Sequence, residues 1–388
     1  MANIIPSTLK VTALKQIALK CGISTSGTKL ILTQRLEDEL PNITLPSANT
    51  SSAIPKPLRV LSIDMGIRNF SYCLLEIIPP SNHTSKLKTP KRKATHNSSD
   101  PVLDLELPSQ TSKPTRKTKT KTLLKTESSP ETTSKPIIPI LQSWQKISLI
   151  PQSSTVSDTE TETKEKVRNE FTPSILSSAA YKLLRHTLLP LSPTHILIER
   201  QRFRTMCSKQ ILEWTIRVNM LESMLWAMLK ALSEEKVWAG QVVEIAPMKV
   251  GKTWIENDGL GVEDGEGFRK VRNTKEAKAR NKGAKIDLVR KWLEAGENQS
   301  DQDEMVIIGS QQVQDVKEKY TAKWDRKVGR VKGSKMKDKS SDAAKKKEEE
   351  VGKLDDLADC LLQGMAWLKW QGNRKRALEE GVEVLLDD

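Results

Sequence analysis

Residues 59–78, RVLSIDMGIRNFSYCLLEII, hold the pattern that decides the fold of this chain. The first six residues form an apolar run that ends in Asp64, which indicates a buried strand. Asn69 to Ile78 has the length and the β-rich content of a second strand, so the two predict a β-hairpin. A domain therefore begins near residue 57, with a carboxylate at the end of its first strand.

Other apolar runs extend this hairpin into a sheet. Three further strands are predicted at 137–150, 193–199 and 241–246. Helices are predicted at 173–189, 210–232, 276–294 and 354–370. Together these elements predict an α/β fold in which a mixed five-stranded sheet is flanked by helices.

The composition points to a polyanionic partner. The 388 residues include 63 Lys and Arg against 49 Asp and Glu, a net charge of +14, which favours nucleic acid over an acidic protein or a neutral metabolite. The four cysteines are far apart and form no CxxC pair, which argues against a zinc knuckle or a disulfide scaffold. There is no run of 18 apolar residues, so we expect no membrane partner, and we expect no small-molecule cofactor.

The remaining segments divide the chain around the main domain. Residues 7–40 predict two short amphipathic helices, and residues 41–56, rich in Pro, Ser and Thr, predict a linker. The main domain is predicted to span 57–372, followed by a C-terminal tail at 373–388. Long disordered insertions are predicted from composition at about 79–136, 151–169 and 300–350.

Four acidic residues lie where predicted elements end or turn inward. Asp64 and Glu199 each end a strand, and Asp356 and Asp359 lie one helical turn apart in KLDDLADCLLQ. Carboxylates gathered at one edge of the sheet would repel one another, so such a cluster is best explained as a site for hard divalent cations, above all Mg²⁺. Two such ions can cleave a phosphodiester. Taken singly, each acid also fits a turn or a helix N-terminus.

Basic and polar side chains next to two of these acids are candidates for binding DNA. Three arginines follow Glu199 directly and suit phosphate groups, although they also could pair with nearby acids. The turn after Asp64 could contact the cleaved strand or be ordinary turn chemistry. The candidates are Arg68, Asn69, Arg200, Gln201, Arg202 and Arg204.

Three motifs, LSIDMGIRNFSYCLLE, ILIERQRFRT and KLDDLADCLLQ, resemble in this order the fungal mitochondrial Holliday-junction resolvases. These are relatives of the bacterial RuvC resolvase in the RNase H-like superfamily. The resemblance implies an RNase H-like resolvase domain in which Asp64, Glu199 and Asp359 are catalytic and bind metal. The fourth carboxylate is Asp356, which fits an i,i+3 spacing, or Asp355, which fits i,i+4. We prefer Asp356 and leave Asp355 open.

Residues 7–40 resemble the SAP-type helix-extension-helix module that these resolvases carry at the N-terminus. This resemblance implies a DNA-binding accessory in which Lys15, Lys20 and Lys29 contact phosphates. The alternative is a small helical hairpin that packs on the catalytic domain.

The resemblance implies a homodimeric, metal-dependent endonuclease that makes paired symmetric nicks in four-way DNA junctions, in mitochondrial DNA recombination and maintenance. It implies Mg²⁺, two ions per active site, with Mn²⁺ as a substitute. One alternative is a non-catalytic RNase H-like and SAP scaffold that binds DNA, and another is a nuclease for RNA–DNA hybrids. The expected location is the mitochondrion, with the nucleus as the alternative because of KTPKRK at 88–93.

Overall fold

A computed structural model describes eight stretches of the chain. They are residues 4–45, 57–78, 138–150, 171–201, 212–254, 275–295, 305–332 and 354–387. All of them belong to one compact unit, Met1–Pro79 with Ile137–Asp388, whereas the second unit, Pro80–Pro136, lies outside the described residues. The predicted insertions at 79–136 and 151–169 therefore lie outside the part of the chain that the structure describes.

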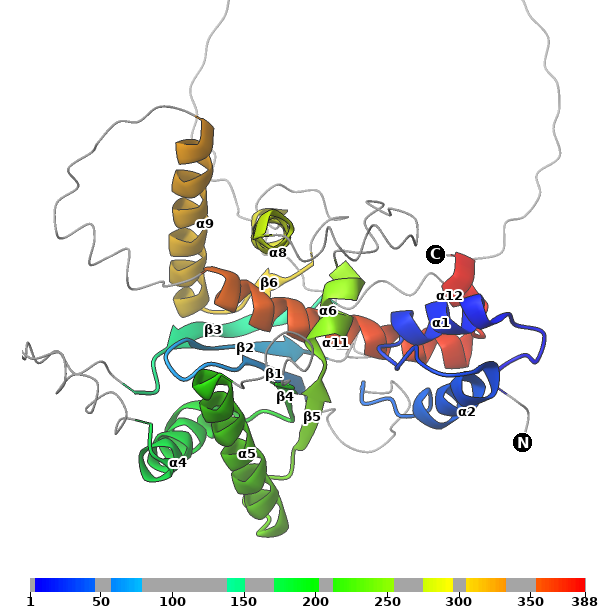
Figure 1. Cartoon of the computed structure of the whole chain (residues 1–388), viewed down its shortest axis with the longest axis horizontal. Helices are drawn as coiled ribbons and strands as arrows, with labels where there is room; N and C mark the ends of the chain where they lie inside the picture. The colour runs from blue at the N-terminus through cyan, green and yellow to red at the C-terminus, as the bar shows by residue number, and fades with distance from the viewer. Residues whose placement is uncertain are drawn as a thin grey trace, which may run out of the picture. The chain divides into compact units, whose positions relative to one another are not determined.

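A mixed sheet of six strands forms the centre of this unit (Figure 1). The strands are β1 (Leu58–Asp64), β2 (Phe70–Ile77), β3 (Ile140–Ile147), β4 (His195–Glu199), β5 (Gln241–Ile245) and β6 (Ile307–Ile308). Their order across the sheet is β5-β4-β1-β2-β3-β6. β2 is antiparallel to both β1 and β3, whereas β4 runs parallel to β1 and to β5, and β6 runs parallel to β3. The mixed α/β sheet is confirmed, with one strand more than the five predicted.

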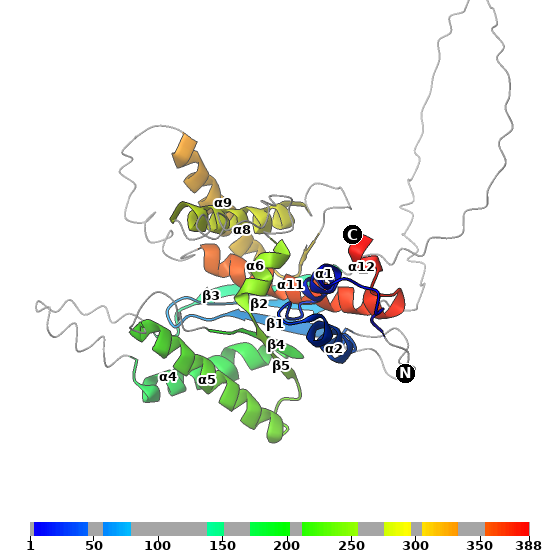
Figure 2. The same cartoon turned by 45° about the vertical axis from the view of Figure 1, so that its right-hand side comes forward.

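Helices cover both faces of the sheet (Figure 2). On one face lie α4 (Pro173–Lys182), which continues as the π-helical turn η1 (Leu183–Leu188) and the 3₁₀ turn η2 (Leu189–Leu191), and α5 (Glu213–Glu234). On the other face lie α6 (Pro247–Trp254), α8 (Lys275–Ala295), α9 (Gln311–Lys332) and α11 (Leu354–Glu379). None of the described helices is both long enough and apolar enough to cross a membrane.

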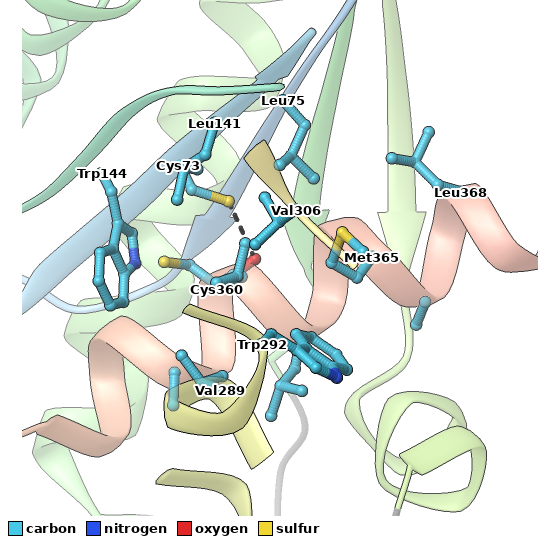
Figure 3. Close-up of a cluster of buried hydrophobic side chains, with 14 of the residues drawn as sticks. Cys73, Leu75, Leu141, Trp144, Val289, Trp292, Val306, Cys360, Met365 and Leu368 are labelled. Atoms are coloured by element: carbon cyan, nitrogen blue, oxygen red, sulfur yellow. Dashed lines mark hydrogen bonds between the residues drawn. The ribbon is translucent and has the colours of Figure 1, made fainter. Parts of the chain in front are cut away.

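Alternate residues of each central strand face opposite helix layers. In β1, Leu61 and Ile63 pack toward α4 and α5, whereas Val60 packs toward α11. Figure 3 shows part of this second core, where Cys73 of β2 donates a hydrogen bond to the Cys360 carbonyl of α11 at 3.4 Å. The same alternation turns Asp64 toward the α11 layer.

Two predicted irregular segments are in fact folded. The sequence predicted a disordered insertion at about 300–350, but β6 and α9 occupy 307–332. Val313 and Tyr320 are buried and Val316 packs against the same core, so an apolar stripe at helical spacing anchors this charge-rich helix. That part of the prediction was wrong, and the remaining residues up to 350 lie outside the described ones.

The predicted C-terminal tail at 373–388 was also wrong. α11 continues through Glu379, and α12 (Val384–Asp387) follows. Ala377, Val382 and Leu385 are buried, because the N-terminal helices pack against them. The sequence did not predict α6, which begins at Pro247, a residue type that is well tolerated in a first helical turn.

The N-terminal helices α1 (Val11–Lys20) and α2 (Lys29–Glu39) form a hairpin on the last turns of α11 and on α12 (Figure 1). Gly22 ends α1 with φ of 67°, and a Cβ there would lie 2.4 Å from Cδ2 of Trp370. The two predicted helices are confirmed and they pack on the main domain. Their identification as a SAP-like DNA-binding module stays a prediction.

Candidate active site

The ends of two parallel strands place two acids side by side. β1 and β4 are paired with Ile63 opposite Ile198. The next residues, Asp64 and Glu199, are the last residues of these strands and therefore lie side by side. Both side chains lie on the face that α11 covers, because they alternate with residues of the opposite core. This adjacency comes from the strand pairing and brings together two residues that are 135 positions apart.

The first turns of α11 bring a second pair of carboxylates to this edge. Asp355 and Asp356 lie in the first turn, where the partial positive charge of a helix N-terminus favours acidic side chains. Asp359 follows one turn later. The helix can approach the sheet closely because a Cβ at Gly364 would lie only 2.8 Å from Cδ1 of Leu75.

The acids of the cluster shift one another's protonation. Burial, followed by the charge and hydrogen bond of Glu199, raises the pKa of Asp64 well above its usual value. The charges of Asp359 and Asp356 act on Asp64 in the same direction. Burial is also the main reason that the pKa values of Glu199 and Asp359 are raised. A carboxyl group with a raised pKa is one whose negative charge the surroundings disfavour, so the cluster as a whole calls for a cation.

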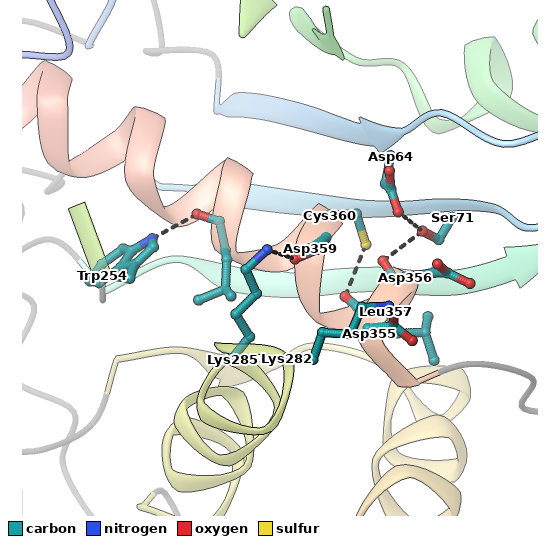
Figure 4. Close-up of polar contacts among 11 residues, drawn as sticks. Asp64, Ser71, Trp254, Lys282, Lys285, Asp355, Asp356, Leu357, Asp359 and Cys360 are labelled. Carbon is teal, nitrogen blue, oxygen red and sulfur yellow. Dashed lines mark hydrogen bonds and ion pairs between the residues drawn. The ribbon is translucent and has the colours of Figure 1, made fainter. Parts of the chain in front are cut away.

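Three lysines that the sequence did not single out supply positive charge at this site, and Figure 4 shows two of them, Lys282 and Lys285. Lys146 of β3 contacts Asp356 at 2.7 Å, and Lys285 of α8 contacts Asp359 at 2.7 Å. Lys282 of α8 pairs with Asp355. Only the pairing of β2 with β3 and the packing of α8 on α11 place these lysines beside the acids, so no local motif could have identified them.

Ser71 and Gln363 hold α11 against the strand ends. The Ser71 hydroxyl, on β2 opposite Asp64, donates to the backbone carbonyl of Asp356 at 2.7 Å and lies 3.5 Å from Oδ2 of Asp64. Gln363 donates from Nε2 to atoms of both β1 and β4. Neither residue was among the candidates, because a serine in a strand and a glutamine in a helix are common in any protein.

The residues of the cluster fit divalent cations, but they do not form a closed ligand set. Among the described residues, no three His, Cys, Asp or Glu side chains are already arranged to hold a metal ion. Lys146 and Lys285 engage oxygen atoms that a metal would use. Burial raises the pKa values of Asp64, Glu199 and Asp359, and the charge of Asp359 acts on both Asp64 and Glu199, so these half-buried carboxylates lie close together. Hard oxygen ligands of this kind suit Mg²⁺ or Mn²⁺.

The loop after Glu199 is tied to neighbouring elements. The Arg200 guanidinium contacts Glu244 of β5 at 2.5 Å, which is the pairing with a nearby acid considered above. The backbone N–H of Gln201 donates to Oε2 of Glu222 on α5 at 3.2 Å. Arg202 and Arg204 lie outside the described residues.

The other predicted DNA contacts lie in the turn after Asp64 and on the N-terminal hairpin. The Arg68 guanidinium stands 5.3 Å from the centre of the Phe171 ring, and Asn69 follows it in the turn between β1 and β2. Lys15 and Lys29 are exposed on the hairpin, where Lys29 donates to the Ser7 carbonyl at 2.7 Å.

The comparisons with known proteins agree on one group. The profile of the family described as "Mitochondrial resolvase Ydc2 / RNA splicing MRS1" matches residues 60–377. The chain is 24% identical over 374 residues to "Cruciform cutting endonuclease 1, mitochondrial" of Schizosaccharomyces pombe, an alignment that covers 95% of each protein. Among solved structures it is similar to the yeast mitochondrial Holliday junction resolvase Ydc2, with a TM-score of 0.50 and 19% identity over 97% of this chain and 100% of the other. The last match shows that this chain shares the fold of that solved structure.

The family profile begins in β1 and ends in the last turns of α11, so it contains all four acidic positions of the cluster. It covers far more than half of the chain. This protein therefore belongs to the family of the mitochondrial resolvase Ydc2 and the RNA-splicing protein MRS1.

Proposed function

We propose that this protein is a Holliday-junction resolvase, a structure-selective endonuclease that makes paired symmetric nicks in four-way DNA junctions. The observation that carries this proposal is the gathering of half-buried carboxylates from β1, β4 and α11 at one end of the sheet. The net charge of +14 suits a DNA substrate. The names of the two relatives, a cruciform cutting endonuclease and a Holliday junction resolvase, support the same activity.

The proposed cofactor is Mg²⁺, with two ions per site and with Mn²⁺ as a substitute. Asp64, Glu199, Asp359 and Asp356 would hold them. Bound ions of this kind activate water and stabilise the leaving oxygen of a phosphodiester. Asp356 is preferred over Asp355 because the charge of Asp356 acts on Asp64. Each of the two is also paired with a lysine, Asp356 with Lys146 and Asp355 with Lys282.

The chain's own residues prepare this site. Lys146 pairs with Asp356 and Lys285 pairs with Asp359, so both carboxylates of α11 have a cationic partner before a metal binds. The backbone contacts of Ser71 and Gln363 keep the helix beside the strand ends.

DNA contacts are proposed on both sides of the acids. The candidates near the site are Arg68, Asn69, Arg200, Gln201, Arg202 and Arg204, and those on the hairpin are Lys15, Lys20 and Lys29. An exposed ion pair such as Arg200 with Glu244 contributes little stability, so a phosphate can compete for the guanidinium.

A homodimer is proposed because two opposed nicks require two active sites in one complex. α5 offers the surface: Leu212, just before it, and Trp214 and Ile216 in its first turn are exposed apolar side chains, with Leu212 67% exposed. The mitochondrion is the proposed location, since both named relatives are described as mitochondrial, and mitochondrial DNA recombination and maintenance is the proposed role.

The test is cleavage of three substrates by the purified protein: a four-way junction, a linear duplex and an RNA–DNA hybrid, each with Mg²⁺, with Mn²⁺ and with EDTA. We expect metal-dependent, symmetric nicks in the junction alone. Binding without cutting in both metals would support the scaffold alternative, and preferential cutting of the hybrid would support the other nuclease. Sedimentation equilibrium of the free protein and of its junction complex tests the dimer, and a monomer in both would exclude it.

A further inference from the structure

A buried glutamine connects the three elements that carry the acids. The side chain of Gln363 on α11 belongs to a residue that is only 3% exposed. Its Nε2 donates to Oγ of Ser62 at 3.1 Å, to the backbone carbonyl of Ile63 at 3.1 Å, and more weakly to the carbonyl of Leu197 at 3.4 Å. Two of these acceptors belong to β1 and the third belongs to β4.

The positions of these atoms relate directly to the cluster. Ile63 immediately precedes Asp64, and Leu197 lies two residues before Glu199 on the same face of β4. Gln363 lies one helical turn after Asp359 on α11. One amide group therefore fixes the helix that carries Asp359 to the backbone of both strands that end in the other two acids.

Packing alone does not account for a glutamine here. Its neighbours Leu361, Leu362 and Met365 are buried and apolar, and an apolar side chain would fill the same space without needing hydrogen bonds. A buried amide costs about 1–3 kcal/mol unless its partners are in place. A polar group at this position thus specifies one placement of α11 relative to the strands. An apolar contact would not specify the placement in this way.

The carboxylates themselves push in the opposite direction. The pairing of β1 with β4 and the packing of α11 gather Asp356 and Asp359 beside Asp64 and Glu199, and like charges gathered in this way repel one another, which favours moving α11 away from the strand ends. We propose that Gln363 is a positioning residue that holds Asp359 in register with Asp64 and Glu199, so that their oxygens are spaced for divalent cations before a cation binds. This inference rests on the proposed metal-dependent function of the same site.

Mg²⁺ tolerates little error in ligand placement, because it requires near-octahedral geometry at about 2.0–2.1 Å. Outer partners that orient metal ligands typically contribute about 10- to 100-fold to metal affinity or activity. We expect Gln363→Leu to raise the half-saturating Mg²⁺ concentration for junction cleavage by about that factor. The same variant should raise the Kd of the free protein for Mn²⁺, measured by electron paramagnetic resonance without DNA.

The chain offers a matched control in Gln371. It lies two turns further along α11 and is 4% exposed, but its Oε1 accepts from the backbone N–H of Thr44, toward the hairpin. Gln371→Leu removes an equally buried amide at a comparable cost in stability. We expect its Mg²⁺ and Mn²⁺ dependence to stay within about twofold of the parent, since it does not touch the strands of the cluster.

The outcomes distinguish the positioning role of Gln363 from the proposed function of the site. If both leucine variants change Mn²⁺ affinity equally, or neither does, Gln363 has only a structural role and the inference fails. If Gln363→Leu does not fold, Gln363→Met, which keeps the length of the side chain, takes its place in the same comparison. If the parent protein cuts no substrate in either metal, the proposed function fails, whereas the Mn²⁺ titrations still test Gln363.

Discussion

At its first turns α11 brings carboxylates toward two other carboxylates, whereas at its last turns it brings donors toward backbone carbonyls. In the first turns, Asp356 and Asp359 face Asp64 and Glu199, and burial is the main cause that raises the pKa values of Asp64, Glu199 and Asp359. The two ends belong to one continuous helix of 26 residues.

The last turns of α11 are fully engaged with the hairpin. Asn373 donates to the Lys20 carbonyl at 2.6 Å, and Arg374 donates from Nε to the Cys21 carbonyl at 3.0 Å. Arg374 also reaches the carbonyls of Glu39 and Asn42 at 3.4 and 3.3 Å. A cation beside the C-terminal carbonyls of two helices is in its favoured electrostatic environment.

The contrast indicates a division of labour along one helix. The last turns of α11, which we call the hairpin end, stabilise the fold. In the first turns, which we call the acid end, the charges are arranged unfavourably until divalent cations bind. A change at the acid end should therefore alter catalysis more than stability, and a change at the hairpin end should do the reverse.

The largest effect is expected for Asp64→Asn. Because it removes a central ligand, cleavage in Mg²⁺ should fall by at least about 10³-fold, or roughly 4 kcal/mol in the barrier. Junction affinity should change little, and thermal stability in EDTA should rise because one repelling charge is gone. Cleavage assays, binding by gel shift and calorimetry measure the three quantities. The exposed Asp38→Asn is the control, and comparable cleavage by Asp64→Asn and the parent would refute the assignment of the site.

Arg374→Met should act mainly on stability. It removes charge-assisted hydrogen bonds to the ends of α1 and α2, so urea unfolding should show a loss of about 2–4 kcal/mol. Cleavage at saturating junction and Mg²⁺ should stay within about threefold of the parent. The neighbouring Lys375→Met, which loses only a loose pair with Glu379 at 3.8 Å, should cost less than about 0.5 kcal/mol. Equal losses for the two variants would mean that the hairpin end is not specially stabilised.

The pH dependence of stability should distinguish the two ends as well. Because the pKa values of Asp64, Glu199 and Asp359 are raised in the folded protein, it binds more protons than the unfolded chain from about pH 4 up to the raised values. Stability in EDTA should therefore fall as the pH rises through this window.

Mg²⁺ should flatten this slope, because bound cations stabilise the ionised carboxylates. The informative quantity is the difference between EDTA and Mg²⁺ in calorimetric scans from pH 5 to 8. Burial lowers the pKa of His195, which contributes an opposite slope at low pH, but this contribution is present in both conditions and cancels. Identical slopes with and without Mg²⁺ would show that the cluster does not bind the ion.

The smallest effect is expected for Lys15→Gln, which asks whether the hairpin end also contacts DNA. Lys15 is exposed, so stability should not change. One lost phosphate contact should weaken junction binding a few-fold and lower the slope of log K against log salt by about 0.9. Lys230→Gln on α5, where the lysine pairs with Glu234, is the control. An unchanged salt slope for Lys15→Gln would leave the hairpin a purely stabilising role.

The acids could be predicted from the sequence because local signals mark them. Asp64 and Glu199 end apolar runs, and the DDLAD pattern opens a helix, so strand polarity alone directs them toward a common edge. The helix 311–332 was within reach too, since Val313, Val316 and Tyr320 recur at helical spacing, but the high charge of the segment concealed this periodicity.

The partners of the acids could not be predicted, because they depend on contacts between distant segments. Lys146 reaches Asp356 only because β3 pairs with β2 in one particular register, and Lys285 reaches Asp359 only because α8 packs on α11. Gln363 is a single polar residue in an apolar stretch, which marks it as unusual but gives no indication of its acceptors.

The continuity of α11 also fixes the distance between the acids and the N-terminal hairpin. At a rise of about 1.5 Å per residue, Asp356 and Arg374 lie about 27 Å apart along the helix. Because α11 is one continuous helix, this distance between the acids and the hairpin is fixed. DNA advances about 3.4 Å per base pair, so this distance corresponds to about eight base pairs. If the hairpin lysines bind a junction arm parallel to α11, an arm shorter than about eight base pairs would reach the acids but not the hairpin, and its cleavage would no longer depend on Lys15.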